Sequence, residues 1–206
     1  MSQHERGPQV TVIERLTTPL DPAVFERELV AYARRRETHK GFEALVTAES
    51  ITRPGTYLHL DRWSSLDRLL QVSHEGGESA ARLPGLGTCT AAHSELMVSA
   101  GRMTARGKLV DAACVVFVHA VLEGEAEQFE LDFGALVGQC VPDTGFGGSC
   151  LLRSAADPHA YTGMLWWLDP EGCEQVRSGA GYLDRLTKLS ASAQITEEPA
   201  RLLWAA

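Results

Sequence analysis

The chain has 206 residues and a formal net charge of −8 at pH 7, with 44% hydrophobic and 22% charged residues. This balance is typical of packed globular proteins and differs from that of disordered chains. The acidic charge argues against a nucleic-acid partner, because phosphate binding requires a basic surface. The longest apolar run is far shorter than the ~20 residues of a membrane helix, and the polar start lacks an apolar signal core. We therefore predict a cytoplasmic protein with no membrane partner.

The sequence resembles itself at an offset of 104 residues, without gaps, from about residue 12 to residue 77. The matches include residue types that are rare in the chain and seldom coincide by chance. They pair Gly41-Phe42 with Gly145-Phe146, Pro54 with Pro158, Tyr57 with Tyr161, and Trp63 with Trp167. Repetition at a fixed offset indicates a duplicated structural unit. We predict an N-terminal unit over residues 1–99, a Gly-containing basic linker over 100–111, and a C-terminal unit over 112–206.

The first unit begins with a predicted strand over residues 10–16, where apolar and polar types alternate and β-branched residues are frequent. Asp21-Pro22 then supplies an N-cap and a proline at the first helical position, and Phe25, Leu29 and Tyr32 form the apolar stripe of a helix. Further strands are predicted over residues 42–51 and 56–63, with a turn at Arg53-Pro54-Gly55 between them. A helix over 65–74 and a strand over 93–99 complete the unit.

The second unit repeats this order, with strands predicted over residues 115–121, 149–154, 161–167 and 201–204. One helix precedes the second of these strands, with five apolar residues on one face, and another begins at Glu171 after Asp169-Pro170. The order β-α-β-β-α-β is that of a ferredoxin-like unit, whose sheet has helices on one face and needs cover on the other. The predicted fold class is α+β, with two tandem ferredoxin-like units forming an intramolecular dimeric α/β-barrel.

Candidate functional side chains lie on the third strand of the first unit. The period of two places four of them on one face: Tyr57, His59, Asp61 and Trp63. Two rings, an imidazole and a carboxylate make this face more polar than an ordinary core and suit it to a flat aromatic ligand. The equivalent face of the second unit keeps the rings and loses the other two groups: Tyr161, Gly163, Leu165 and Trp167. We therefore predict that the active pocket lies in the N-terminal unit.

The segment from Tyr57 to His74 resembles the strand–helix signature of the antibiotic biosynthesis monooxygenase family, in which the strand ends in Trp and the next helix ends in His. Trp63 and His74 fit both points; in the second unit Trp167 fits, but Ser178 stands in place of the histidine. The resemblance implies a dimeric α/β-barrel and an enzyme, a monooxygenase of aromatic polyketide pathways without a metal or tightly bound cofactor. Anthrone-oxidising members carry an Asn four residues before the Trp, and this chain contains no Asn. Tandem members include the ring-opening oxygenases of angucycline pathways, which cleave a carbon–carbon bond.

Oxidation of a phenol by O₂ without a cofactor requires that the phenol be deprotonated, because the anion gives up an electron more readily. His59 and His74 are the predicted bases, since the ordinary pKa of histidine, ~6.5, is close to neutral pH. Asp61 is a candidate for orienting the base. We predict that Tyr57, Trp63, Tyr161 and Trp167 contact the substrate. No metal and no bound cofactor are predicted, and reduced flavin as a co-substrate is the alternative.

The predicted function is an oxygenase that acts on a polycyclic quinone or phenol in antibiotic biosynthesis, with or without carbon–carbon bond cleavage. One alternative is a polyketide cyclase on the same fold, which consumes no O₂. Another is a non-catalytic barrel that only binds ligands. The predicted partners are the small aromatic substrate and O₂. A homodimer of the chain is a further possibility that the sequence leaves undecided.

Overall fold

The structure, a computed structural model, describes residues 8–75 and 91–205. It divides into two compact units, residues 1–99 with 203–206, and residues 100–202. The first unit contains β1 (Val10–Thr17), α1 (Pro22–Arg36), β2 (Phe42–Ser50), β3 (Thr56–Trp63), α2 (Leu66–Glu75) and the start of β4 (Ala91–Thr104). The second contains β5 (Cys114–Leu122), α4 (Ala126–Cys140), β6 (Phe146–Ser154), β7 (Ala160–Trp167), α5 (Pro170–Ser178), α6 (Ala180–Leu189) and most of β8 (Ala193–Ala205).

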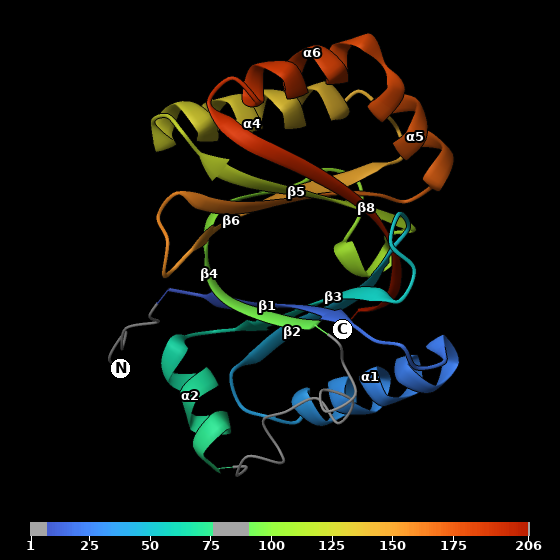
Figure 1. The fold of residues 1–206 in the computed structure, drawn as a ribbon, viewed down its shortest axis with the longest axis vertical. Coiled ribbons are helices and arrows are strands. Elements are labelled where there is room, and N and C mark those ends of the chain that lie inside the picture. The colour runs from blue at the N-terminus through green and yellow to red at the C-terminus, as the bar shows by residue number, and fades with distance from the viewer. Residues whose placement is uncertain (1–7, 76–90, 206) are drawn as a thin grey trace. The chain divides into compact units, whose positions relative to one another are not determined.

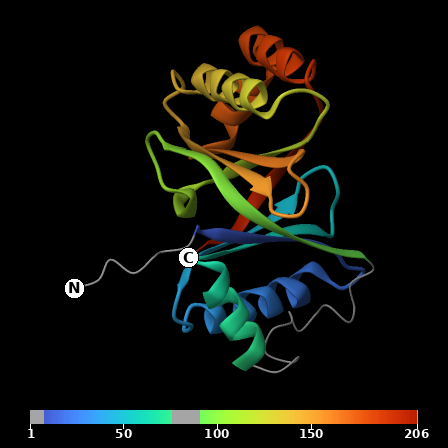
Figure 2. The same ribbon diagram turned by 90° about the vertical axis from the view of Figure 1, so that its left-hand side faces the viewer.

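Each unit is an antiparallel sheet with helices on one face. In the first, β1 pairs with β3 and β4, and β2 pairs with β3. In the second, β5 pairs with β7 and β8, and β6 pairs with β7. Helices α1 and α2 cover the first sheet, and α4, α5 and α6 cover the second (Figures 1 and 2). The hydrogen-bonded strand order, β1-β3-β2-β8-β5-β7-β6-β4, is closed, which confirms the predicted α+β fold class with tandem units in a barrel topology.

The internal repeat holds in the structure residue by residue. The bounds of α1, β2 and β3 become those of α4, β6 and β7 when 104 is added to each residue number. Both hairpins also carry a register shift at the same place, between Phe42 and Ala44 in one unit and between Phe146 and Gly148 in the other. Over these elements the two units are structural copies, so that they differ there in their side chains.

The predicted caps and helix faces are confirmed. The Asp21 carboxylate accepts hydrogen bonds from the backbone N–H groups of Ala23 and Val24 at the start of α1. Asp169 caps α5 in the same way. The stripe predicted for α4 is its buried face, Phe129, Phe133, Leu136, Val137 and Cys140, which packs on the second sheet as one continuous apolar core. The first unit divides its apolar core into smaller clusters, and a polar group lies between them.

Residues 100–111 are not the linker that their glycines and basic residues predict. Strand β4 continues to Thr104, and a 3-10 turn follows at Leu109–Asp111. The carbonyl of Gly147 accepts a hydrogen bond from the N–H of Ala105, and a side chain at Gly148 would clash with the carbonyl of Met103. The extension therefore packs against β6, whose glycines allow the close approach. Helix α6 was also not predicted, although Tyr182 and Leu189 form its buried side.

Candidate functional site

The predicted face of β3 points toward α1, because each of its four side chains contacts a residue of that helix. The Tyr57 ring lies 4.8 Å from that of Phe25, and the His59 ring lies 5.5 Å from that of Tyr32. The Arg36 guanidinium lies 3.1 Å from the Asp61 carboxylate and 5.3 Å from the Trp63 ring. All four β3 side chains are fully or almost fully buried. We call these β3 residues together with Glu14, Tyr32, Arg36 and Thr47 the polar cluster.

His59 is held by Thr47 rather than by Asp61. Strands β2 and β3 place Thr47 directly opposite His59, and the Thr47 Oγ1 lies 2.9 Å from His59 Nδ1. The other ring nitrogen, Nε2, is buried and has no hydrogen-bond partner among the described residues. Burial and the charge of Arg36 lower the pKa of His59 to about 3, so the imidazole is neutral at pH 7. The ordinary histidine pKa on which the prediction rested therefore does not apply to His59 in this cluster.

Asp61 forms an ion pair with Arg36, not with a histidine. Burial raises the pKa of the Asp61 carboxyl, and the charge of Arg36 opposes that rise. Arg36 is the last residue of α1 and also stacks over the Tyr32 ring at 5.1 Å. It ends a run of three arginines, of which only Arg36 is buried, because it lies on the buried stripe of the helix. The stripe i, i+3, i+4 and i+7 from Leu29 includes Arg36 at its last position and could have identified it.

Glu14 adds a second carboxyl group to the same face. Strand register places it directly opposite His59 on β1, as Thr47 lies opposite His59 on β2. Burial raises the pKa of Glu14 against the lowering effect of Arg36, and Asp61 raises it further. Burial likewise raises the pKa of the Tyr32 hydroxyl. The cluster therefore places one guanidinium among two carboxyl groups and a neutral imidazole in a largely buried site.

His74 lies in the last turn of α2, and its side chain is outside the described residues. The predicted substrate contacts of the second unit have different surroundings. Trp167 is fully buried in the apolar core, 5.1 Å from the Phe146 ring. The Tyr161 hydroxyl donates a hydrogen bond to Glu130 Oε1 at 2.9 Å. Tyr161 is thus hydrogen-bonded to Glu130, a residue that lines the cavity described below, whereas Trp167 is part of the apolar core.

The second unit keeps the Tyr and Trp rings of the polar cluster and has apolar residues at its other equivalent positions. Adding 104 to Arg36, Thr47, His59 and Asp61 gives Cys140, Leu151, Gly163 and Leu165. Phe133 occupies the space in which an imidazole would stand, because a Cβ at Gly163 would lie 2.3 Å from its ring. The polar cluster is therefore a property of one copy of the fold and not of the fold itself.

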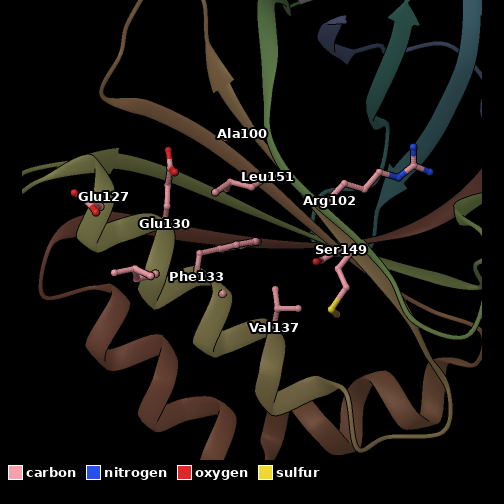
Figure 3. A pocket seen from close by; sticks show the side chains of 12 residues that line it. Ala100, Arg102, Glu127, Glu130, Phe133, Val137, Ser149 and Leu151 are labelled. Carbon is pink, nitrogen blue, oxygen red and sulfur yellow. The ribbon is translucent and has the colours of Figure 1, made fainter. Parts of the chain in front are cut away.

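A cavity of about 370 Å³ lies between α4 and strands β4 and β6, wholly within the second unit (Figure 3). Its lining residues are Ala100, Gly101, Arg102, Met103, Glu127, Glu130, Leu131, Phe133, Gly134, Val137, Ser149 and Leu151. The active pocket was predicted in the other unit. The cavity was not predicted, because the sequence of its lining segments is that of an ordinary amphipathic helix and ordinary strands.

His119 stands on the opposite face of the second sheet from the cavity. Its Nδ1 lies 3.2 Å from Thr162 Oγ1, and its Nε2 lies 3.4 Å from the carboxylate of buried Glu198. This pair comes from adjacent strands, β5 and β8. Among the described residues, no group of three or more His, Cys, Asp or Glu side chains is arranged to hold a metal ion. In the same ranges, no helix has the length and apolarity that crossing a membrane requires.

No protein-family model matches the sequence, and no curated protein matches it. Solved structures do match. A provisionally named monooxygenase from Fusobacterium nucleatum has a TM-score of 0.79 at 10% identity, over 98% of this chain and 95% of its own. An anthrone oxidase-like protein has a TM-score of 0.70 at 13% identity, over 100% and 95%. A ferredoxin-fold protein related to antibiotic biosynthesis monooxygenases, from Listeria monocytogenes, has a TM-score of 0.56 at 10% identity, over 95% of both chains.

These similarities extend over both units, so the fold implied by the sequence resemblance is confirmed. At such low identities the likeness concerns the fold, and one fold serves many activities. What this chain does has to be argued from its own side chains.

Proposed function

We propose that the chain is an oxygenase that uses O₂ to oxidise a polycyclic aromatic phenol or quinone, with the polar cluster of the first unit as its acid–base site. The observation that carries this proposal is the state of His59. Its ring is fixed through Nδ1 by Thr47, and its buried Nε2 has no hydrogen-bond partner among the described residues. Buried polar atoms without a partner are rare in folded proteins and call for an explanation such as a bound molecule or a catalytic role.

His59 is the proposed base, with His74 as the second candidate. A neutral imidazole is the form that accepts a proton, and Thr47 can stabilise the tautomer whose Nε2 carries the lone pair. The low pKa of about 3 is caused by burial and by Arg36. A phenolate formed against Nε2 brings a negative charge that stabilises the imidazolium, so that substrate binding and proton transfer support each other.

The deprotonated ring then reduces O₂. One electron passes from the anion to O₂, and the resulting radical and superoxide combine to form a carbon–oxygen bond. At a ring methylene, the peroxide loses water to leave a carbonyl: one oxygen atom enters the product, the other leaves as water, and the methylene loses both hydrogens. The substrate supplies all four electrons, so no cofactor or reductant is required. A buried site favours this chemistry because it keeps water from the radical and the peroxide.

The remaining members of the cluster bind and position the substrate in this proposal. Tyr57 and Trp63 offer ring faces and edges, and Asp61 keeps Arg36 in place beside the developing charge. Because α1 packs over His59 through Tyr32, the substrate reaches Nε2 only when that helix shifts.

Oxygen uptake by the purified chain tests the proposal. We expect a panel of hydroxyanthrones and hydroxynaphthoquinones to include a compound that consumes O₂ in proportion to its loss, after treatment with a chelator and without added flavin. Conversion of the compound at the same rate under argon would indicate a cyclase. Tight binding without product would indicate a non-catalytic barrel, and turnover that depends on reduced flavin would contradict the cofactor-free reaction.

A further inference from the structure

We propose that the cavity of the second unit is a binding site for a flat aromatic phenol, separate from the polar cluster and without acid–base chemistry of its own. This goes beyond the proposed oxidation, because it assigns ligand binding to the copy that lacks the equivalents of His59 and Asp61. The cavity volume of about 370 Å³ lies within the range of ~300–1,000 Å³ that is usual for small-molecule sites.

The walls of the cavity are apolar and shaped by α4 and β6. Phe133 and Val137 come from α4 and Leu151 from β6, and their side chains are buried and point into the cavity (Figure 3). Gly134 lies on the same helix face, and a Cβ there would meet no atom within 4 Å. A slot with a phenyl ring on one wall and aliphatic groups on the other suits fused aromatic rings.

One end of the cavity is acidic. Glu127 and Glu130 lie in the first half of α4, whereas the Arg102 side chain points away from both of them (Figure 3). Tyr161 donates its hydroxyl hydrogen to Glu130 Oε1, and Glu130 is itself a lining residue of the cavity. Burial and then Glu130 raise the pKa of Tyr161, so that it stays a donor at neutral pH. The ligand that fits has an apolar ring system with a hydroxyl donor at one end.

The side chains that line this site differ between the two units. In the first unit the positions equivalent to Phe133, Val137 and Leu151 are occupied by Leu29, Ala33 and Thr47. Thr47 is there engaged by the imidazole of His59. In the second unit the absence of a side chain at Gly163 lets Phe133 lie against β7. The layer between helix and sheet is polar in the first unit, and it is apolar with a cavity in the second.

Binding of 2-naphthol, compared with 2-methoxynaphthalene, tests this proposal by titration calorimetry. Gly134→Leu fills the cavity and Gly138→Leu is the matched control, because Gly138 is on the same helix, is exposed and has equally open space, but does not line the cavity. Both changes replace a helical glycine and favour the helix. We expect Gly134→Leu to weaken 2-naphthol binding at least tenfold and Gly138→Leu to leave it unchanged. Glu130→Gln should weaken 2-naphthol severalfold and leave the methoxy compound unaffected, since a hydrogen bond to a charged acceptor is stronger.

Carbon-13 methyl spectra of methionine give a readout that does not depend on the folding of a variant. Met103 lines the cavity, whereas Met97 and Met164 are buried elsewhere. A bound naphthalene ring should shift the Met103 methyl signal, which Met103→Leu identifies, more than the other two. Equal binding by the wild type and Gly134→Leu, or ligand shifts at Met97 without any at Met103, would overturn the proposal. Because no turnover is measured, these outcomes are independent of whether the first unit oxidises a phenol.

Discussion

His59 illustrates what a residue's type can and cannot predict. Alternation along β3 identified the face on which it lies, because every second residue of a strand shares a side. Its partner Thr47 comes from the neighbouring strand and could be predicted only with the hairpin register. The pKa of the imidazole is lowered first by burial and then by the charge of Arg36, and neither could be predicted from the residue type alone. A histidine predicted as an ordinary base is thus neutral far below pH 7.

The lowered pKa of His59 makes a prediction for stability against pH. The folded state holds the pKa at about 3, below the ordinary value of 6.5. Between these values the unfolded chain binds a proton that the folded chain does not, so the free energy of unfolding falls as pH is lowered through this window. Relative to pH values below 3, His59 adds as much as ~5 kcal/mol to the free energy of unfolding, and this addition is complete above pH 6.5.

Urea denaturation at pH 7.5 and pH 4.5 measures this contribution. His59→Gln should lose much less stability on acidification than the wild type. The matched control is His159→Gln, because His159 is exposed in the loop before β7 and should keep the wild-type pH dependence. Equal pH dependence of all three proteins would show that His59 titrates normally in the folded state.

At the scale of elements, most strands and helices that alternate or carry an apolar stripe were predicted to within three residues. The exception is β8, which begins at Ala193 and not at the predicted residue 201. The other misses have separate causes. The extension of β4 is exposed over residues 100–102, and its pairing depends on glycines in a distant strand, so its own sequence contains no strand pattern. Helix α6 follows α5 after a single residue, Gly179, and therefore looks like part of a longer polar segment.

The packing of α4 on β7 makes a prediction at this scale. A Cβ at Gly163 would lie 2.3 Å from the Phe133 ring, so Gly163→Ala should lower the free energy of unfolding by ~1–3 kcal/mol. Leucine stands at the position equivalent to Phe133 in the first unit. Phe133→Leu should therefore remove the clash, and the double variant should be more stable than the sum of the two single changes predicts. Chemical denaturation of the four proteins gives the coupling, and strictly additive effects would rule out this contact.

The whole molecule consists of two copies of one unit. The copies share the arrangement of their strands and helices and differ in the buried side chains between helix and sheet. The repeat predicted this architecture because thirteen residues of the first half are identical to the residues 104 positions later in the second half. It could not predict where the space for a ligand lies. A cavity is defined by what is missing between side chains, and Phe133, Gly134 and Leu151 become its walls only when α4 is placed on β6.

The two units differ in their buried charged groups, and this difference bears on function. The first unit retains a costly buried set of charges, with its histidine, and the second retains none of it. Burying charged groups is unfavourable unless they are paired, and such groups gather at functional sites. We infer that the acid–base chemistry belongs to the first unit, whatever the second unit binds.

Oxygen uptake by His59→Gln, beside His159→Gln, is the most direct test of this account. With a compound that the wild-type chain oxidises, kcat should fall about 100-fold or more in His59→Gln, the usual loss when a general base is removed, and should not change in His159→Gln. Circular dichroism at the assay pH verifies that both variants are folded. A folded His59→Gln protein that consumes O₂ at the wild-type rate would contradict the assignment of the acid–base site.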